Sequence, residues 1–282
     1  MQLIGKIPEM RNFSRAERAA GGKVAFVPTM GFLHEGHGAL LSEGKRRAQK
    51  LVLSIFVNPT QFDRKDDFDK YPRDTERDLS LARGHGVDAV FLPEASEMYP
   101  EGYDTYVSVG RLAEPLCGGS RPGHFRGVAT VVAKLFAAVE PDVALFGEKD
   151  YQQLAVIRRM TRDLNLPVEI VGMPTIREKD GLALSSRNAR LSKEARAKAL
   201  VLYRSIQALR EAYRKGERGA GKLESLARKT LESEGGVRVD YAQVRDAESL
   251  EELGTIERPA VYAVAAFVGD VRLIDNTVLG TA

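Results

Sequence analysis

The sequence predicts an α/β protein whose larger part is built on an open parallel sheet. Apolar runs of strand length alternate with amphipathic helical segments as far as Pro174. The runs are continuous, which is typical of strands covered on both faces. After Pro174 this alternation gives way to charged helical segments and longer strand-like segments. Alternating strands and helices imply right-handed crossovers, and therefore a doubly wound parallel sheet followed by a smaller α+β unit.

Five apolar runs account for the strands expected in the sheet. They occupy residues 23–27, 51–57, 89–92, 143–146 and 168–171. The clearest helix between them carries apolar residues at helical spacing, namely Val128, Val131, Val132, Leu135, Phe136 and Val139. This stripe predicts one buried helix face.

The second part of the chain predicts two helices and two strands. The first helix spans roughly residues 192–215, and a break rich in glycine separates it from a second helix that ends near Glu234. The strands are expected at 237–244 and 261–268. The sequence thus predicts two domains, residues 1–175 and residues 176–282.

Composition excludes several classes of protein. The 282 residues carry a net charge of +3, and 43% are apolar and 29% charged, as in ordinary globular proteins. The near balance of charge argues against nucleic acid or an anionic membrane as the main partner. The longest apolar run, 260–269, is about half of the ~20 residues that cross a bilayer, so we expect a buried strand there. A single cysteine, Cys117, and a charged start without an apolar leader favour a cytoplasmic protein.

Two histidines follow the first strand of the expected sheet. His34 and His37 lie where a helix is expected to begin, at about His37. Ligands of open α/β sheets bind beyond the carboxyl ends of strands, and a helix N-terminus there presents unpaired N–H groups to phosphate. A zinc site is an alternative, but only His85 and His124 remain as further histidine ligands. Surface or structural histidines are another alternative. We favour contact with a polyphosphate.

Two amides follow the second strand. Asn58 and Gln61 flank Pro59, and neutral amides suit the hydroxyl groups or carboxylate of a small polar substrate. The alternative is a capped turn in which Asn58 bonds its own backbone.

Cationic side chains occur in two further segments. Lys149 follows the strand at 143–146 and could follow charge that develops on phosphorus, while Asp150 beside it could accept from ribose hydroxyls. Ser185, Ser186 and Arg187 near the start of the second part resemble a triphosphate clamp, which would close over the strand edge. Capping residues and solvated charges are the alternatives for both segments.

Together these four segments resemble the pantoate:β-alanine ligase family, within the superfamily that shares the His-x-Gly-His element. The order and spacing of the segments match, and the stretches 67–74, 117–128 and 271–276 are also typical of the family. Leu184 and Gly38 depart from it, since methionine and a bulkier residue are expected at those positions.

The resemblance implies a fold, an activity and partners. The fold is a Rossmann-like domain with a smaller C-terminal lid domain. The activity is condensation of (R)-pantoate with β-alanine through pantoyl adenylate, with Mg-ATP consumed and AMP and pyrophosphate released. Members are usually homodimers. The rival activities are a nucleotidyltransferase that leaves the nucleotide on its product and an ATP-binding regulatory module without turnover.

The resemblance also implies the residues of the site. His37 is the expected proton donor, supported by His34, Lys149 and Arg187. The expected substrate contacts are Gln61, Gln153 and Asn58. The expected ATP contacts are Met30, Gly31, Phe32, Leu33, His34, Glu35, Gly36, His37, Gly147, Glu148, Lys149, Asp150, Ile176, Leu184, Ser185, Ser186 and Arg187. We interpret His85 as a solvent-exposed residue at a helix end, and the loop around His124 as a gate for substrate.

Overall fold

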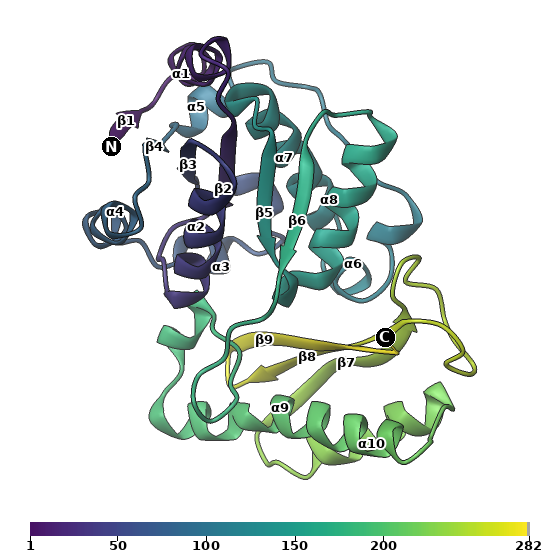
Figure 1. The fold of residues 1–282 in the computed structure, drawn as a ribbon. Coiled ribbons are helices and arrows are strands. Elements are labelled where there is room, and N and C mark those ends of the chain that lie inside the picture. Colours follow the sequence, from purple (N-terminus) through teal and green to yellow (C-terminus); the bar gives the residue numbers. More distant parts are fainter. Residues whose placement is uncertain (281–282) are drawn as a thin grey trace. The chain divides into compact units, whose positions relative to one another are not determined.

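The computed structural model of the chain describes residues 1–280, which fall into two compact units (Figure 1). The sheet unit consists of Met1–Ala113, Arg121–Glu148 and Gln153–Pro174. The C-terminal unit consists of Glu114–Ser120, Lys149–Gln152 and the chain from Thr175 onward. The units differ from the predicted domains in those two short segments, and independent domains with a boundary near residue 175 stay a prediction.

The sheet unit contains a six-stranded parallel sheet in the order β1-β4-β3-β2-β5-β6, so the predicted fold class is confirmed. Its strands are β1 (Gln2–Ile4), β2 (Val24–Thr29), β3 (Lys50–Ile55), β4 (Ala89–Phe91), β5 (Val143–Gly147) and β6 (Glu169–Met173). Five of them lie on the five apolar runs. The edge strand β1 was missed because three residues are too few to show a periodic pattern.

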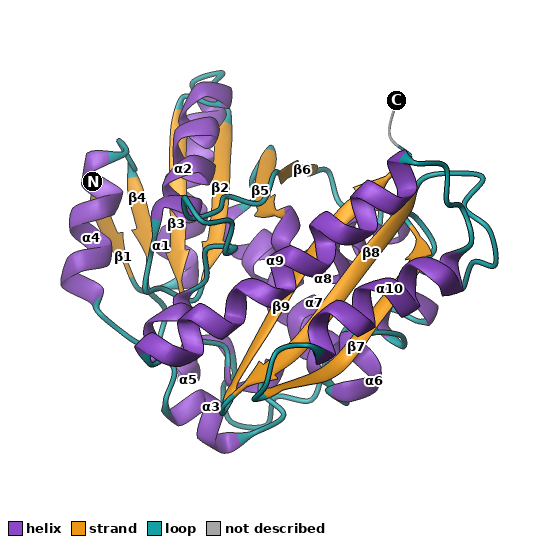
Figure 2. Ribbon diagram, turned by 90° about the horizontal axis from the view of Figure 1, so that it is seen from below, coloured by secondary structure: helices purple, strands orange, loops and turns teal. Residues whose placement is uncertain are grey.

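Helices cover both faces of this sheet (Figure 2). The helices of this unit are α1 (Ile7–Ala19), α2 (Glu35–Arg47), α3 (Lys65–Asp69), α4 (Thr75–Gly84), α5 (Ala95–Met98), α7 (His124–Val139) and α8 (Tyr151–Asp163). On one face Leu41 of α2 and Ala82 of α4 pack with Val27 of β2 in a single buried cluster. On the other face Phe136 of α7 packs edge-on against Phe26 of β2. The predicted apolar stripe of α7 is buried as expected.

The strand order creates a switch point beside β2. Its neighbours are β3 and β5, and from β2 the chain winds outward in both directions. In doubly wound sheets, ligands bind at the carboxyl ends of the strands next to such a point. The segments after β2, β3 and β5 therefore lie where the fold itself predicts a site.

The C-terminal unit is an antiparallel three-stranded sheet with α9 (Lys193–Arg214) and α10 (Ala220–Glu232) packed on it. Its strands are β7 (Val237–Asp246), β8 (Ala260–Val268) and β9 (Val271–Leu279), with β8 in the centre. The buried strand predicted from the longest apolar run is therefore confirmed. The short helix α6 (Cys117–Ser120) also belongs to this unit. Strand β9 was missed because it contains an adjacent Asp-Asn pair, two residue types that are rare in strands.

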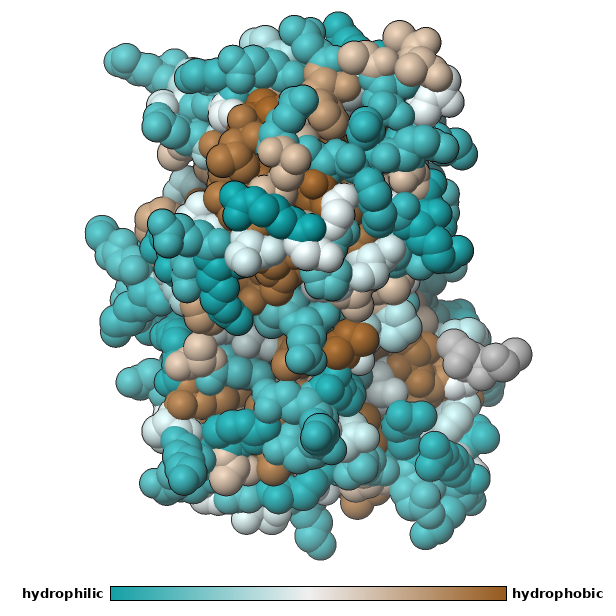
Figure 3. All heavy atoms as spheres, turned by 60° about the vertical axis from the view of Figure 1, so that its left-hand side comes forward, coloured by the Kyte–Doolittle hydropathy of each residue, from teal (hydrophilic) through white to brown (hydrophobic). Residues whose placement is uncertain are grey.

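Within residues 1–280, few large apolar side chains are exposed. The face drawn in Figure 3 is mostly hydrophilic, with apolar groups in scattered patches. No helix within residues 1–280 is both long and apolar enough to cross a membrane.

Candidate active site

The ends of β2 and β3 lie side by side at the switch point. The two strands are paired up to Thr29 and Ile55, so the histidine segment and the amide segment leave the sheet at the same level. The two predicted clusters of the sheet unit are thus brought to one edge of the sheet.

The two histidines form a reciprocal cap at the start of α2. The Nδ1 atom of His34 accepts from the backbone N–H of Gly36 at 3.1 Å, and the Nδ1 atom of His37 accepts from the backbone N–H of His34 at 3.3 Å. Their ring centroids are 4.1 Å apart. Because both Nδ1 atoms accept, each neutral ring carries its proton on Nε2. The Nε2–H group of each ring is therefore a hydrogen-bond donor.

This cap corrects two expectations about the helix start. Helix α2 begins at Glu35, slightly before the predicted start at about His37, since the ring of His34 serves as its N-cap. Backbone N–H groups that were expected to face phosphate are already bonded within the chain: that of Gly31 to Thr29 Oγ1 at 3.1 Å, and those of His34 and Gly36 to the imidazoles. These amides are therefore not unpaired donors, and the groups of this segment suited to donate to an anion are the imidazole N–H groups.

A buried carboxylate that the sequence analysis missed holds the turn before His34. Asp78 of α4 accepts from the N–H of Phe32 at 2.7 Å and from that of Leu33 at 2.7 Å, and its side chain is 1% exposed. Burial raises the pKa of Asp78, and the two N–H bonds oppose that shift only in part. An aspartate on a helix apart from the motif gives no signal in the sequence, because helix α4 is brought to the turn only by the fold.

The side chain of Gln61 is held by neighbours on both sides. Its Oε1 accepts from Asn58 Nδ2 at 3.1 Å, and its Nε2 donates to Met30 Sδ at 3.1 Å. Asn58 is 1% exposed and caps the short helix η1 (Pro59–Gln61), accepting from Thr60 N. Tyr99 Oη also donates to Asn58 Oδ1 at 2.7 Å, and burial raises the pKa of Tyr99 to about 12, which keeps its hydroxyl protonated. This geometry favours the capped-turn interpretation of Asn58.

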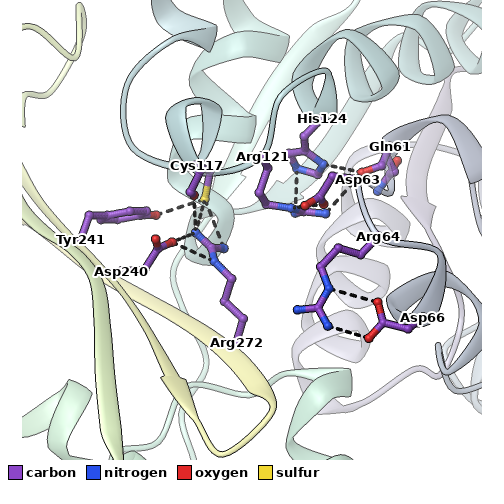
Figure 4. A network of polar contacts seen from close by, with 11 residues as sticks. Gln61, Asp63, Arg64, Asp66, Cys117, Arg121, His124, Asp240, Tyr241 and Arg272 are labelled. Atoms are coloured by element: carbon purple, nitrogen blue, oxygen red, sulfur yellow. Dashed lines mark hydrogen bonds and ion pairs between the residues drawn. The ribbon is translucent and has the colours of Figure 1, made fainter.

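His124 supports the backbone of Gln61 (Figure 4). Its Nδ1 donates to the carbonyl oxygen of Gln61 at 2.7 Å, so Nε2 is left to accept from Arg121 at 3.2 Å. Arg121 in turn pairs with Asp63 at 2.9 Å. Gly127 on the first turn of α7 permits this approach, since a Cβ there would lie 2.7 Å from the Cα of Gln61. The loop was interpreted as a gate, but in this structure its histidine is bound to the amide segment.

In the C-terminal unit, a hydrogen bond to its carbonyl oxygen fixes the backbone of Lys149. Asn276 of β9 donates from Nδ2 to the carbonyl oxygen of Lys149 at 2.9 Å. The Nζ of Lys149 lies 3.9 Å from Asp150, and the lysine side chain is 17% exposed. Lys149 therefore presents a largely enclosed ammonium group on a fixed backbone.

The same strand holds the segment around Cys117. Arg272 of β9 pairs with Asp240 at 2.7 Å and donates to Cys117 Sγ at 3.5 Å, while Tyr241 Oη lies 3.1 Å from that sulfur (Figure 4). Burial raises the pKa of Tyr241, and the adjacent thiol raises it further. The backbone N–H of Cys117 also donates to Gln152 at 3.0 Å. These contacts explain why two short segments from the first part of the chain belong to the C-terminal unit.

The predicted clamp segment is a tight loop anchored on β9. Leu184 N donates to Ile176 O at 3.0 Å, which brings these two expected ATP contacts together. Ser185 caps the short helix η4 (Ser186–Arg190) by accepting from the N–H of Arg187 at 3.2 Å. Asp275 holds the loop through Arg177, with its two carboxylate oxygens 2.6 and 2.8 Å from the guanidinium nitrogens.

The remaining expected residues lie on the same elements. Gly147 ends β5, Glu148 begins the short helix η3 (Glu148–Asp150), and Gln153 is half-buried in the first turn of α8. His85 is at a helix end as predicted, but it is half-buried and not exposed, with Nδ1 3.0 Å from Ser42 Oγ. A Cβ at Gly38 would lie 2.8 Å from His85 Nε2, so His85 fills the space of a bulkier residue 38. Within residues 1–280, no three His, Cys, Asp or Glu side chains are grouped as a metal site.

Comparison with known proteins places this chain in a family. The family model described as pantoate-beta-alanine ligase matches residues 2–278. Pantothenate synthetases of Pelobacter propionicus and Geobacter sulfurreducens are 56% and 53% identical over 280 residues, covering 99% of this chain and 99% of each relative.

Solved structures agree with the sequence comparisons. The crystal structure of pantothenate synthetase from Thermus thermophilus is similar with a TM-score of 0.93 and 47% identity, covering 98% of this chain and 99% of that one. The pantoate-beta-alanine ligase of Francisella tularensis, crystallised with beta-gamma ATP and beta-alanine, has a TM-score of 0.81 and 31% identity, covering 98% of this chain and 97% of that one. The chain therefore belongs to the pantoate-beta-alanine ligase family and is a ligase.

Proposed function

We propose that this ligase joins (R)-pantoate to β-alanine through a pantoyl-adenylate intermediate, in pantothenate and coenzyme A biosynthesis. The observation that carries the proposal is the arrangement at the ends of β2 and β3. Two imidazoles with Nε2–H groups suited to phosphate follow β2, and an anchored amide suited to a small hydroxy acid follows β3. An ATP-binding regulatory module without turnover has no need of the second feature.

In the proposed first step, a carboxylate oxygen of pantoate attacks the α-phosphorus of Mg-ATP. The bond from that phosphorus to the bridging oxygen breaks, and pyrophosphate leaves with its electron pair. Such a displacement needs positioning and stabilisation of charge more than covalent help from the protein. Mg²⁺ enters with ATP as part of the substrate and balances charge on the phosphate oxygens.

The proposed ATP contacts come from each unit. In the sheet unit, the segment 30–37 binds the phosphates chiefly through His34 and His37, whose Nε2–H groups donate to oxygens, and His37 is the proposed proton donor. Gly147 and Glu148 follow at the end of β5. In the C-terminal unit, the proposed contacts are Lys149, Asp150, Ile176, Leu184, Ser185, Ser186 and Arg187, of which Lys149 and Arg187 carry positive charge.

Gln61 and Gln153 are the proposed contacts of pantoate. Asn58 acts through Gln61, because its own polar atoms are engaged with Gln61, Thr60, Tyr99 and the Gly127 carbonyl. In the second step the amine of β-alanine, bound near Gln61, attacks the acyl carbon. The bond from that carbon to AMP breaks, the nitrogen loses a proton, and pantothenate and AMP are released.

Omitting the substrates one at a time tests the reaction. With Mg-ATP and pantoate alone, we expect at most one equivalent of pyrophosphate per site, since the adenylate stays bound; AMP should accumulate only when β-alanine is added. The rival activity, a nucleotidyltransferase, would instead release a stable nucleotidylated product without β-alanine. Detecting that product by mass spectrometry would overturn the proposal.

Replacing Gln61 with alanine should impair the use of pantoate selectively. We expect the KM for pantoate to rise at least ~10-fold, because a hydrogen bond to a charged group is worth roughly 1.5–3 kcal/mol, while the KM for ATP changes little. Initial rates of pyrophosphate release measure both constants. Gln207→Ala, at an exposed position of α9, is the control. An equal rise in both constants would show general damage to the site.

We also propose a cytoplasmic homodimer. A single buried cysteine supports a reducing compartment, and the resemblance to the family supports the dimer. Sedimentation equilibrium tests the assembly, with twice the 31.0 kDa mass of the chain as the expected result.

A further inference from the structure

Asp78 is a buried carboxylate that bonds two successive N–H groups of the nucleotide segment. Its two oxygens are 2.7 Å from the nitrogens of Phe32 and Leu33, one oxygen to each. The carboxylate comes from α4, far from this turn in the sequence, and its side chain is 1% exposed. Such bonds with an ionised acceptor are shorter and stronger than those between neutral groups.

The turn that Asp78 holds is one that an L-residue adopts at a cost. Phe32 has a φ of +50°, in the left-handed region, and Gly31 before it has a φ of +81°. A Cβ at residue 31 would lie 3.0 Å from Asp78 Oδ2 and 3.0 Å from Ile55 Cγ2. The turn is therefore tightly packed between α4 and the end of β3. The two hydrogen bonds from its N–H groups to one carboxylate stabilise the left-handed conformation, which is unfavourable for Phe32.

The backbone conformation of this turn determines the orientation of the two imidazole rings. Leu33 directly precedes His34, whose backbone N–H must point at His37 Nδ1 and whose ring must reach the N–H of Gly36. Both contacts depend on the path by which the chain enters α2. A change in the peptide planes of residues 32 and 33 would rotate His34 and release the cap that aims both Nε2–H groups.

We propose that Asp78 is a positioning residue for the reaction, which aims His34 and His37 by holding the left-handed turn at Phe32 and Leu33. The inference rests on the proposed contact of these histidines with ATP. Both oxygens of Asp78 accept from backbone N–H groups, so its effect on turnover is exerted through the two imidazoles.

Asp78→Asn tests the proposal against a matched control. Asparagine keeps the shape but can accept at only one of the two positions. We expect the KM for ATP to rise at least ~10-fold and kcat for pyrophosphate release to fall, with the KM for pantoate within about twofold. Asp74→Asn makes the same change on the same helix, at its N-cap, where asparagine caps as well as aspartate. The control should leave all constants within about twofold of the original chain.

A double-mutant cycle separates positioning from general support of the fold. In a His37→Gln background, Asp78→Asn should lower the rate of pyrophosphate release much less than in the original chain, because two groups that act through one another are not additive. Losses that multiply, or an unchanged KM for ATP in the single variant, would overturn the proposal.

Two measurements on the unsubstituted protein test the proposal without an activity assay and without a variant, which could fail to fold. Hydrogen exchange should show the amides of Phe32 and Leu33 protected, and NMR should show both histidines as Nε2–H tautomers in the free protein. Rapid exchange at both amides would contradict the inference. Failure of the AMP assay with these signals intact would instead contradict the proposed function and leave the geometry standing.

Discussion

Replacing Lys149 with alanine should slow the formation of pyrophosphate from Mg-ATP and pantoate by at least ~10², because one prepared contact with a developing charge is commonly worth this much. The backbone of Lys149 is held by Asn276 and its side chain is largely enclosed, so the ammonium group needs little reorganisation at the moment of reaction. Single-turnover quenched flow measures the step directly, without the second half-reaction.

The matched control is Lys215→Ala, at the exposed end of α9. It removes the same charge from the same unit and should leave the rate unchanged. Thermal unfolding of the Lys149 variant should also match the original chain, since the contact with Asn276 uses the backbone carbonyl and survives the substitution. A normal rate of pyrophosphate release in the Lys149 variant would remove this residue from the proposed chemistry.

Replacing Asp275 with alanine should lower the free energy of unfolding by about 3 kcal/mol or more, the usual result of breaking a buried ion pair from one side. The Asp275 side chain is 3% exposed and pairs with Arg177 through both oxygens. Its loss leaves a guanidinium group in a place from which water is largely excluded. Because Arg177 begins the loop that leads to Ser185, the KM for ATP should rise as well.

Urea unfolding followed by circular dichroism measures this effect. Asp270→Asn, in the exposed turn between β8 and β9, is the control and should change stability by less than about 0.5 kcal/mol. The double variant Arg177→Met/Asp275→Leu should recover part of the lost stability, since it removes both charges together. If the double variant were as unstable as Asp275→Ala, the loss would come from packing and not from the unpaired charge.

The architecture of the sheet unit could largely be predicted from the sequence because both of its signals are local. Continuous apolar runs predicted β2 to β6, and the helical stripe from Val128 to Val139 predicted the buried face of α7. Strand β9 escaped prediction because Asp275 and Asn276 are poor strand formers, which here bond Arg177 and the Lys149 carbonyl. A strand whose polar side chains hydrogen-bond to neighbouring segments lacks the apolar sequence pattern of a strand that only packs in the core.

The chemistry of the site could be predicted more fully than its support. His34, His37, Gln61 and Lys149 follow strands of the parallel sheet, at the carboxyl ends where open sheets bind ligands. Asp78 lies within α4 and His124 begins α7, each remote in the sequence from the residues that it bonds. In the sequence Asp78 resembles an ordinary surface residue, and the His124 loop was interpreted only as a gate. They belong to the site because each makes a hydrogen bond to the backbone of a site segment. The residue type alone does not predict such a hydrogen bond.

The sequence alone thus determined the class of fold, the order of the motifs and the chemical groups available, since propensity, periodicity and residue type are properties of short segments. Tertiary structure decided the direction of those groups. The Nε2–H form of the two imidazoles follows from bonds at Nδ1, the turn before them follows from a carboxylate on α4, and the place of Gln61 follows from His124 and Asn58. Hydrogen bonds depend on distances and angles between segments remote in the chain, and only the folded protein specifies them.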